Sequence, residues 1–129
     1  MNNQLKLFNL AEEAAQRAYA PYSNFHVGAA ILSNSGNFYQ GCNVENISYP
    51  VGTCAEESAI AAMVCAGDTK IEEILIYADS KQLITPCGAC RQRIFEFADN
   101  NTKVHFANSS GIQKTVNSSN LLPDTFKEF

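Results

Sequence analysis

The sequence has little charge and no long hydrophobic run. Charged residues make up 17% of its 129 residues, against about 25% in an ordinary soluble domain. This shortage predicts that part of the surface is buried against other copies of the chain. No apolar stretch approaches the roughly 18 residues that a membrane-spanning helix needs, so no membrane partner is expected.

Positive charge is also scarce, and no basic run occurs. Nine Lys and Arg residues stand against thirteen Asp and Glu residues, which gives a formal net charge of −4. Such a chain is a poor electrostatic match for a polyphosphate, so nucleic acid is not expected as a partner. The segment 1–10 lacks the charged, apolar and small-residue order of a secretory signal. We therefore expect a cytoplasmic protein.

No internal repeat, low-complexity tract or linker interrupts the chain. Its length suits one domain, which we place at residues 1–129. Apolar residues make up 46%, close to the usual globular share, and this argues against intrinsic disorder. A single folded domain with one hydrophobic core is therefore predicted.

Hydrophobic periodicity predicts three helices and five strands. The first helix should be stopped by Pro21, the second closed by Gly67, and the third should follow Pro86. The expected ranges are 5–18 and 53–65 for the first two helices, and 26–32, 38–44, 71–78, 103–107 and 112–116 for the strands. This order suits a single sheet covered by helices on both faces.

Five cysteines are present, which is an odd number. Because a cytosolic setting keeps thiols reduced, metal binding or catalysis is favoured over a disulfide framework. Three of the five lie in two short segments, Thr53-Cys-Ala-Glu56 and Pro86-Cys-Gly-Ala-Cys90. Each segment leads into a predicted helix, where backbone N–H groups and the positive end of the helix dipole favour thiolates.

Three thiolates would leave a tetrahedral zinc ion with one position for water, as in a catalytic site. Zinc lowers the pKa of its bound water toward about 7 and so supplies hydroxide in neutral solution. Glu56, two residues after Cys54, would then lie close to the metal without binding it. A proton shuttle is needed at that place.

Each segment has a simpler interpretation when it is taken alone. A Cys-x-x-Cys pair is more often a redox pair or half of a structural zinc site. Thr53-x-x-Glu56 is also a capping box, in which Glu56 only satisfies a helix-end amide. A redox pair does not require a third cysteine at a separate helix, and a structural site usually requires a fourth protein ligand. The combination favours a catalytic zinc centre.

Cys-x-Glu followed about thirty residues later by Pro-Cys-x-x-Cys is the signature of zinc deaminases. Further segments narrow the match, and they lie at residues 19–30, 41–46, 86–92 and 121–123. With these segments the chain closely resembles the small cytidine deaminases over nearly its whole length. The resemblance implies an α/β fold, a three-layer α/β/α sandwich with a mixed five-stranded sheet, and one zinc ion per subunit.

The resemblance also implies an activity, the hydrolysis of cytidine and deoxycytidine to uridine and deoxyuridine plus ammonia, a step of pyrimidine salvage. In the implied mechanism zinc is held by Cys54, Cys87 and Cys90, and its hydroxide attacks the ring carbon that carries the amino group. Glu56 takes the proton of the water, passes it to the neighbouring ring nitrogen, and later helps ammonia to leave.

Four substrate contacts follow from the resemblance. Asn43 and Glu45 resemble a pair that binds the ribose hydroxyls, and Ala55 is a further nucleoside contact. Phe25 resembles the aromatic residue that packs on the pyrimidine. Taken alone, this phenylalanine is explained as well by ordinary core packing.

The resemblance implies a homotetramer whose active sites are completed by neighbouring subunits. Tyr49 and Phe126 are therefore expected to reach the active site of a neighbour. Alanine-rich faces on the first two predicted helices would allow helices to approach closely. These faces and the low charge content agree with an oligomer but fix no subunit number.

Residue 57 departs from the family pattern. Three-cysteine members commonly have Arg directly after the catalytic Glu, whereas this chain has Glu57. A zinc ion with three thiolates carries one net negative charge, which a nearby Arg would offset. Arg91, directly after Cys90, is well placed to donate to a ligand sulfur. We expect Arg91 to offset this charge alone and Glu57 to point away.

The other cysteines and the two histidines have no role that the resemblance assigns. Cys42 and Cys65 are expected to be small buried apolar residues. His26 and His105 fall on strand-like runs away from the motifs and are expected to be structural.

Three other functions share parts of the pattern. A blasticidin-type deaminase would share the metal motif, but the segment 43–46 and Phe25 favour free nucleosides. A polynucleotide-editing deaminase should display basic grooves, which the net charge opposes. A zinc-stabilised binding protein without activity requires Glu56 to be only a helix cap.

Overall fold

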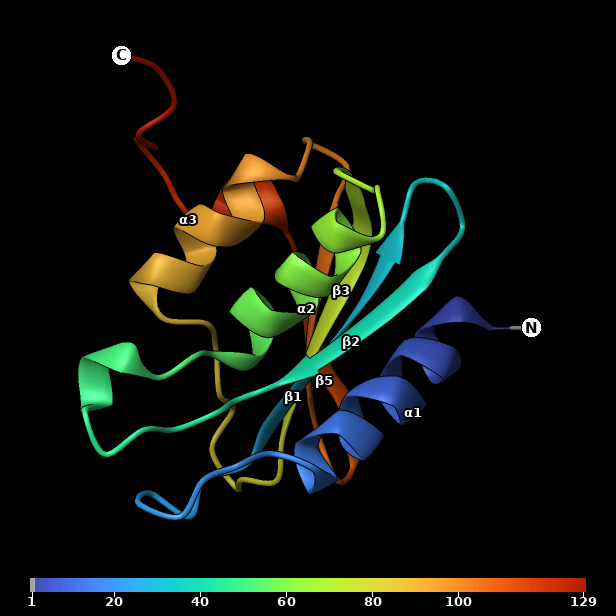
Figure 1. The fold of residues 1–129 in the computed structure, drawn as a ribbon. Helices are drawn as coiled ribbons and strands as arrows, with labels where there is room; N and C mark the ends of the chain where they lie inside the picture. Colours follow the sequence, from blue (N-terminus) through green and yellow to red (C-terminus); the bar gives the residue numbers. More distant parts are fainter. Residues whose placement is uncertain (1) are drawn as a thin grey trace.

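A mixed five-stranded sheet forms the centre of the fold (Figure 1), with the strand order β2-β1-β3-β4-β5. The computed structural model describes residues 2–129, so Met1, the first residue of the N-terminal segment considered above, lies outside the described residues. The strands are β1 Val27–Ser33, β2 Phe38–Cys42, β3 Ile71–Ala78, β4 Lys103–Asn108 and β5 Gly111–Asn117. β3 and β4 are parallel, and the other neighbouring pairs are antiparallel.

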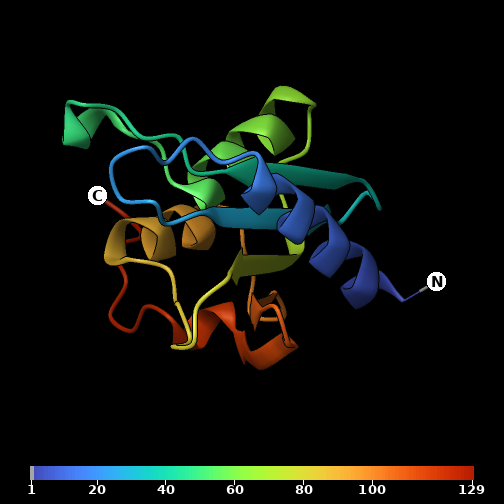
Figure 2. The ribbon, with the colours of Figure 1, turned by 90° about the horizontal axis from the view of Figure 1, so that it is seen from below.

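Helices cover both faces of the sheet. α1 (Asn3–Gln16) lies on one face, and α2 (Ala55–Cys65) and α3 (Gly88–Glu96) lie on the other (Figures 1 and 2). Two short 3-10 helices, η1 (Tyr49–Val51) and η2 (Ser118–Asn120), were not predicted. The expected three-layer α/β/α sandwich with a mixed five-stranded sheet is confirmed.

The central strands are buried on both faces, because successive side chains of a strand point to opposite sides. In β1, Ile31 packs in the α2 and α3 cluster, whereas Leu32 packs against α1. In β3, Ile74 likewise packs in the α2 and α3 cluster, and Leu75 packs against α1. A strand buried on both sides needs a continuous apolar run, which is why β3 could be predicted over its full length.

The first helix ends earlier than its periodicity predicted, at Gln16. The backbone N–H of Tyr19 donates to the carbonyl of Asn43, and the N–H of Glu45 donates to the carbonyl of Tyr19. Because the chain is extended here, Ala18 lies beyond the helix. The prediction that Pro21 ends α1 is therefore wrong. The helix ends before a parallel bridge between Tyr19 and Val44, which holds the segment after α1 beside the segment after β2.

The start of α2 is held against the end of β2 by close backbone packing. A Cβ atom added at Gly41 would lie 2.1 Å from Ser58 Oγ and 2.3 Å from the backbone N of Ala59. These contacts leave no room for a side chain at residue 41. The absence of a Cβ atom therefore sets how closely α2 lies on the sheet.

The other end of α2 is fixed by Asp68, which follows the left-handed Gly67. One carboxylate oxygen of Asp68 accepts hydrogen bonds from Ser33 Oγ at 2.9 Å, Ser35 Oγ at 2.8 Å and the Tyr39 hydroxyl at 2.5 Å. These bonds, the one from Tyr39 above all, lower the pKa of Asp68 to about 2. They tie the end of α2 to the β1–β2 hairpin.

Among residues 2–129, no helix combines the length and the apolar character needed to cross a bilayer.

Asp68→Asn should change how stability depends on pH. A carboxylate whose pKa is lowered in the folded state stabilises the fold above its ordinary value of 3.8, and this contribution is lost as the pH falls toward about 2. We expect the difference in unfolding free energy between wild type and variant to shrink over that interval. Urea denaturation of both zinc-free proteins at several pH values measures it, and a difference independent of pH would contradict this role.

Candidate metal centre and adjoining cleft

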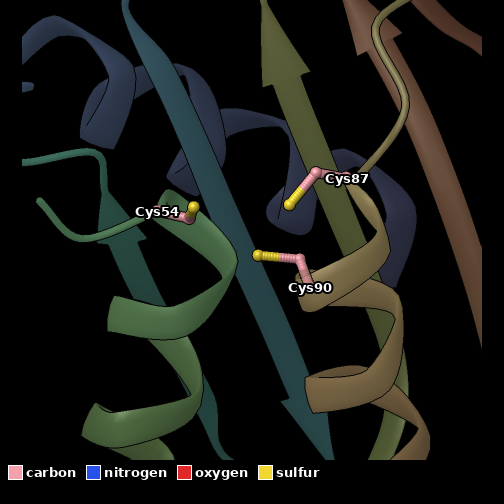
Figure 3. Close-up of side chains that lie close together, drawn as sticks. All are labelled: Cys54, Cys87 and Cys90. Carbon is pink, nitrogen blue, oxygen red and sulfur yellow. The ribbon is translucent and has the colours of Figure 1, made fainter. Parts of the chain in front are cut away.

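Three cysteine side chains from two separate segments point toward one another (Figure 3). The sulfur atoms of Cys54, Cys87 and Cys90 all lie within 4.8 Å of one another. Cys54 is the N-cap of α2, Cys87 is the N-cap of α3, and Cys90 lies in the first turn of α3. Within the described range 2–129, this is the one group of three or more His, Cys, Asp or Glu side chains close enough to share a metal ion.

The two helix N-termini shape the electrostatics of this cluster. Hydrogen bonds from the backbone N–H groups of Cys90 and Ala89 lower the pKa of the Cys87 thiol. Burial raises the pKa of Cys54 and that of Cys90, which is completely buried. Because a metal ion binds thiolates, binding to Cys54 and Cys90 releases their protons.

The donor set fits zinc. A Zn–S distance of about 2.3 Å in a tetrahedron separates the ligand sulfurs by roughly 3.8 Å, and the observed cluster is compatible with this spacing. Thiolates are soft ligands that select zinc over magnesium or calcium. With three protein ligands, a tetrahedral ion keeps one position for water.

Glu56 lies beside the cluster in the first turn of α2 and is 5% exposed. The negative charge of Glu56 disfavours the thiolate form of all three cysteines, while burial raises the pKa of Glu56 itself. The helix cap is made by its neighbour, since the backbone N–H of Cys54 donates to Glu57 Oε1 at 3.3 Å. The capping interpretation of Glu56 is therefore wrong, and its carboxylate is left for other chemistry.

The arginine that contacts a cluster sulfur is Arg93. Its Nη1 lies 3.5 Å from Cys90 Sγ, and its Nη2 lies 3.4 Å from Glu57 Oε2. Arg91 instead donates to the carbonyls of Pro86 at 2.9 Å and Leu121 at 3.0 Å. The expectation that Arg91 alone offsets the thiolate charge is corrected by these contacts.

The reason for this correction is helical geometry. Residues three positions apart on a helix lie on the same face, whereas adjacent residues do not. Arg93 therefore lies over Cys90, and Arg91 points toward the segment before Cys87, whose Pro86 carbonyl it binds. The spacing Cys90-x-x-Arg93 was the signal in the sequence that could have found this contact.

A cleft of about 390 Å³ adjoins the cluster at Cys54. Its size lies within the range of roughly 300–1,000 Å³ that is typical of small-molecule sites. It is lined by Tyr22, Ser23, Asn43, Val44, Glu45, Asn46, Tyr49, Gly52, Thr53 and Cys54. Three of the expected substrate contacts, Asn43, Glu45 and Tyr49, therefore line one cleft that reaches a metal-binding cysteine.

Asn43 and Glu45 also hold the loop that follows α1, a role that the sequence did not indicate. Glu45 accepts hydrogen bonds from the backbone N–H groups of Tyr22 at 3.0 Å and Ser23 at 3.1 Å, and from the Ser23 hydroxyl. This hydroxyl contact is the main cause of the lowered pKa of Glu45. Asn43 accepts from the N–H of Val27 at 2.9 Å and donates to the carbonyl of Phe25 at 2.8 Å.

The other three expected contacts are not among the cleft-lining residues. Phe25 is 37% exposed on the loop held by Asn43, and Ala55 is buried at the start of α2. Phe126 is 65% exposed on the C-terminal segment, where its carbonyl accepts a hydrogen bond from Gln92 Nε2 at 3.0 Å.

The residues without an expected role differ in their surroundings. His105 is fully buried and bonds to Glu73 and Thr115, each at 2.7 Å, which confirms a structural histidine. His26 is exposed. Cys42 is half-buried, and Cys65 is exposed because it ends α2 on its outer side, so its expected burial is wrong.

Comparison with known proteins agrees with this site. A family model described as "Cytidine and deoxycytidylate deaminase zinc-binding region" matches residues 1–107. A cytidine deaminase from Halalkalibacterium halodurans is 40% identical over 98% of this chain and 95% of its own length. One from Sporosarcina psychrophila is 38% identical over 95% of this chain and 90% of its own length.

A solved structure shows the same likeness in three dimensions. The crystal structure of cytidine deaminase from Burkholderia pseudomallei has a TM-score of 0.91 and 39% identity, and covers 98% of this chain and 100% of its own. An α/β/α sandwich that gathers three cysteines at two helix N-termini beside a buried glutamate defines a zinc-dependent hydrolytic deaminase. With these matches, the chain belongs to the cytidine deaminase family.

Cys87→Ser should remove the bound metal. Because a hydroxyl is a much weaker zinc ligand than a thiolate, we expect zinc content after dialysis to fall from about one ion per chain to near zero. Cys65→Ser is the matched control, since Cys65 is exposed and outside the cluster, and it should keep its zinc. Elemental analysis of both proteins measures this, and full zinc content in Cys87→Ser would exclude Cys87 as a ligand.

Proposed function

We propose that this protein hydrolyses cytidine and deoxycytidine to uridine and deoxyuridine with release of ammonia, as a step of pyrimidine salvage. The observation that carries the proposal is a buried carboxylate, Glu56, beside three clustered cysteines at the end of a cleft of nucleoside size. Membership of the cytidine deaminase family supports the same reaction.

The metal would be one zinc ion per subunit, held by Cys54, Cys87 and Cys90. When bound, zinc lowers the pKa of water to about 7 and makes hydroxide available in neutral solution. Backbone N–H groups at the N-terminus of α3 stabilise the thiolate of Cys87 that such binding requires.

Glu56 is the proposed proton carrier. Burial raises the pKa of Glu56, which favours a carboxyl group that accepts and donates a proton in turn. It takes a proton from the attacking water and delivers it to the ring nitrogen next to the amino-bearing carbon, which makes that carbon electrophilic. Glu56 then takes the proton of the hydroxyl group added at that carbon and delivers it to the amino group. The carbon–nitrogen bond breaks and ammonia leaves, so that one water is consumed for each ammonia released.

Asn43 and Glu45 are the proposed ribose contacts. Two carboxylate oxygens offer about four acceptor positions, and the loop occupies three of those of Glu45. The remaining lone pair can accept a hydrogen bond from a sugar hydroxyl. Asn43 likewise retains one N–H and one acceptor position. A site built in this way discriminates against bases that lack the sugar.

Phe25 and Ala55 are the proposed contacts to the base. The backbone of Phe25 is fixed on both sides, by the Ser23 hydroxyl at its N–H and by Asn43 at its carbonyl. An aromatic side chain on a loop fixed in this way can pack on a planar pyrimidine. Ala55 is the first residue of α2, where backbone N–H groups lack helical partners and can bind substrate.

We further propose a homotetramer in which Tyr49 and Phe126 complete the active sites of neighbouring subunits. Apolar side chains of the loop beside the cleft are strongly exposed, with Ile47 at 80%, Tyr49 at 74% and Val51 at 64%. Phe126 is 65% exposed. Large apolar surface of this kind marks an interaction site.

A cytoplasmic location is proposed from the state of the cysteines. Within residues 2–129, all five cysteines are free thiols. Thiols persist in a reducing compartment, whereas secreted proteins tend to pair them. We also propose that residues 1–129 form one catalytic domain, because both metal-binding helices pack on the same sheet.

Glu56→Gln should abolish turnover while zinc is retained. Loss of a general acid–base group typically costs about 10²- to 10⁴-fold in rate. The measurement is ammonia release from cytidine and from free cytosine, with zinc content determined on the same samples. Glu72→Gln, at an exposed position of β3, is the control and should behave as wild type.

Two results would reject the proposed function. The first is near-wild-type turnover of cytidine by Glu56→Gln. The second is wild-type activity on free cytosine alone, which would remove the proposed ribose contacts.

Ile47→Glu should weaken the proposed assembly, because it places a charge in an apolar surface that the neighbouring subunit would bury. Light scattering after size-exclusion chromatography should show a tetramer for wild type and smaller species for the variant. Leu5→Glu, which is 55% exposed on α1, is the control. A wild-type protein that is monomeric at micromolar concentration would contradict the assembly.

A further inference from the structure

We infer that Arg93 offsets the negative charge of the metal centre and that Glu57 positions it, so that the two residues form a clasp between the two metal-binding helices. This inference rests on the zinc centre of the proposed function. It assigns a positioning role to two residues that contact the cluster but do not bind the metal.

The clasp is a continuous set of contacts between α2 and α3. It starts at the backbone N–H of Cys54, which donates to Glu57 Oε1 at 3.3 Å. The other oxygen of Glu57 lies 3.4 Å from Arg93 Nη2, and Arg93 Nη1 lies 3.5 Å from Cys90 Sγ. One metal-binding segment is therefore joined to the other by side chains that are not metal ligands.

The shape of the arginine side chain suits this task. A guanidinium group is planar and carries several N–H donors in a fixed fork, so it can bind a carboxylate and a second acceptor together. Arg93 uses one terminal nitrogen for Glu57 and the other for Cys90. The carboxylate of Glu57 holds the guanidinium group in the orientation that reaches the sulfur.

The net charge of the metal centre explains why a positively charged side chain is needed beside it. Three thiolates around a divalent ion leave one net negative charge, and Glu56 adds a buried carboxylate beside it. Arg91 cannot serve, because its guanidinium nitrogens donate to Pro86, Leu121 and Thr85. Among residues 2–129, the guanidinium group that bonds to a cluster sulfur is that of Arg93.

The exposure of the clasp indicates that it affects zinc binding more than the stability of the fold. The Arg93 and Glu57 side chains are each 37% exposed, and ion pairs near the surface contribute little to the stability of a fold. A hydrogen bond to a metal ligand, in contrast, typically changes metal affinity by about 10- to 100-fold when it is removed. Loss of Arg93 should therefore weaken zinc binding much more than it weakens folding.

The test compares zinc affinity, measured by competition with a chelator, in wild type and in four variants. Arg93→Gln should bind zinc about 10- to 100-fold more weakly. Arg93→Lys keeps the charge and should recover part of the loss. Glu57→Gln keeps an oxygen for the Cys54 N–H but loses the ion pair, so a smaller loss is expected. The double variant should be no weaker than Arg93→Gln.

Arg17→Gln is the matched control. Arg17 forms an ion pair with Glu13 at 3.4 Å, the same distance as the Arg93–Glu57 pair, but on the surface of α1. It should leave zinc affinity and activity unchanged. The sulfur-to-metal charge-transfer bands of the cobalt-substituted protein give a second readout, and they should shift in Arg93→Gln but not in Arg17→Gln.

Wild-type zinc affinity and an unshifted cobalt spectrum in Arg93→Gln would overturn the inference, and so would additive losses in the double variant. Circular dichroism shows whether each variant is folded. If Arg93→Gln does not fold, the zinc affinity of Arg93→Lys is compared with that of wild type instead. Because zinc affinity is measured without substrate, these outcomes do not depend on which nucleoside is deaminated. Failure of the proposed substrate would appear only in the activity assay.

Discussion

The structure depends on the meeting of two helix N-termini on one face of the sheet. α2 follows the extended segment after β2, α3 follows the loop after β3, and both pack in the same apolar cluster. Residues such as Ala59 and Met63 of α2 and Ile94 of α3 fix that packing. Because the cysteines lie at the two helix starts, the packing of the helices sets the spacing of the sulfurs.

Two adjacent glutamates at the start of α2, Glu56 and Glu57, have different surroundings. Glu57 takes the capping position and pairs with Arg93, so Glu56 is free of both tasks. Burial beside the cysteines then keeps the pKa of Glu56 raised. The residue that caps the helix is thus a different one from the buried carboxylate beside the cysteines.

The sequence predicts a feature correctly where a local pattern, such as an apolar run or a spaced motif, determines it. β3, buried on both faces, could be predicted at Ile71–Ala78, and the motif cysteines lie together as expected. Sequence patterns did not predict features that depend on contacts between distant parts of the chain. The bridge at Tyr19 ends α1 early, and the loop contacts of Glu45 depend on residues more than twenty positions away. Adjacency in the sequence points to Arg91, whereas helical spacing places Arg93 over Cys90.

The central claim is that three thiolates hold a zinc ion on which turnover depends. Its most direct test is to remove zinc stepwise from the purified protein with a chelator and to follow cytidine turnover against zinc content, then to restore the metal. The account predicts that activity falls and recovers in proportion to zinc, up to about one ion per chain. Full turnover by the zinc-free protein would contradict it.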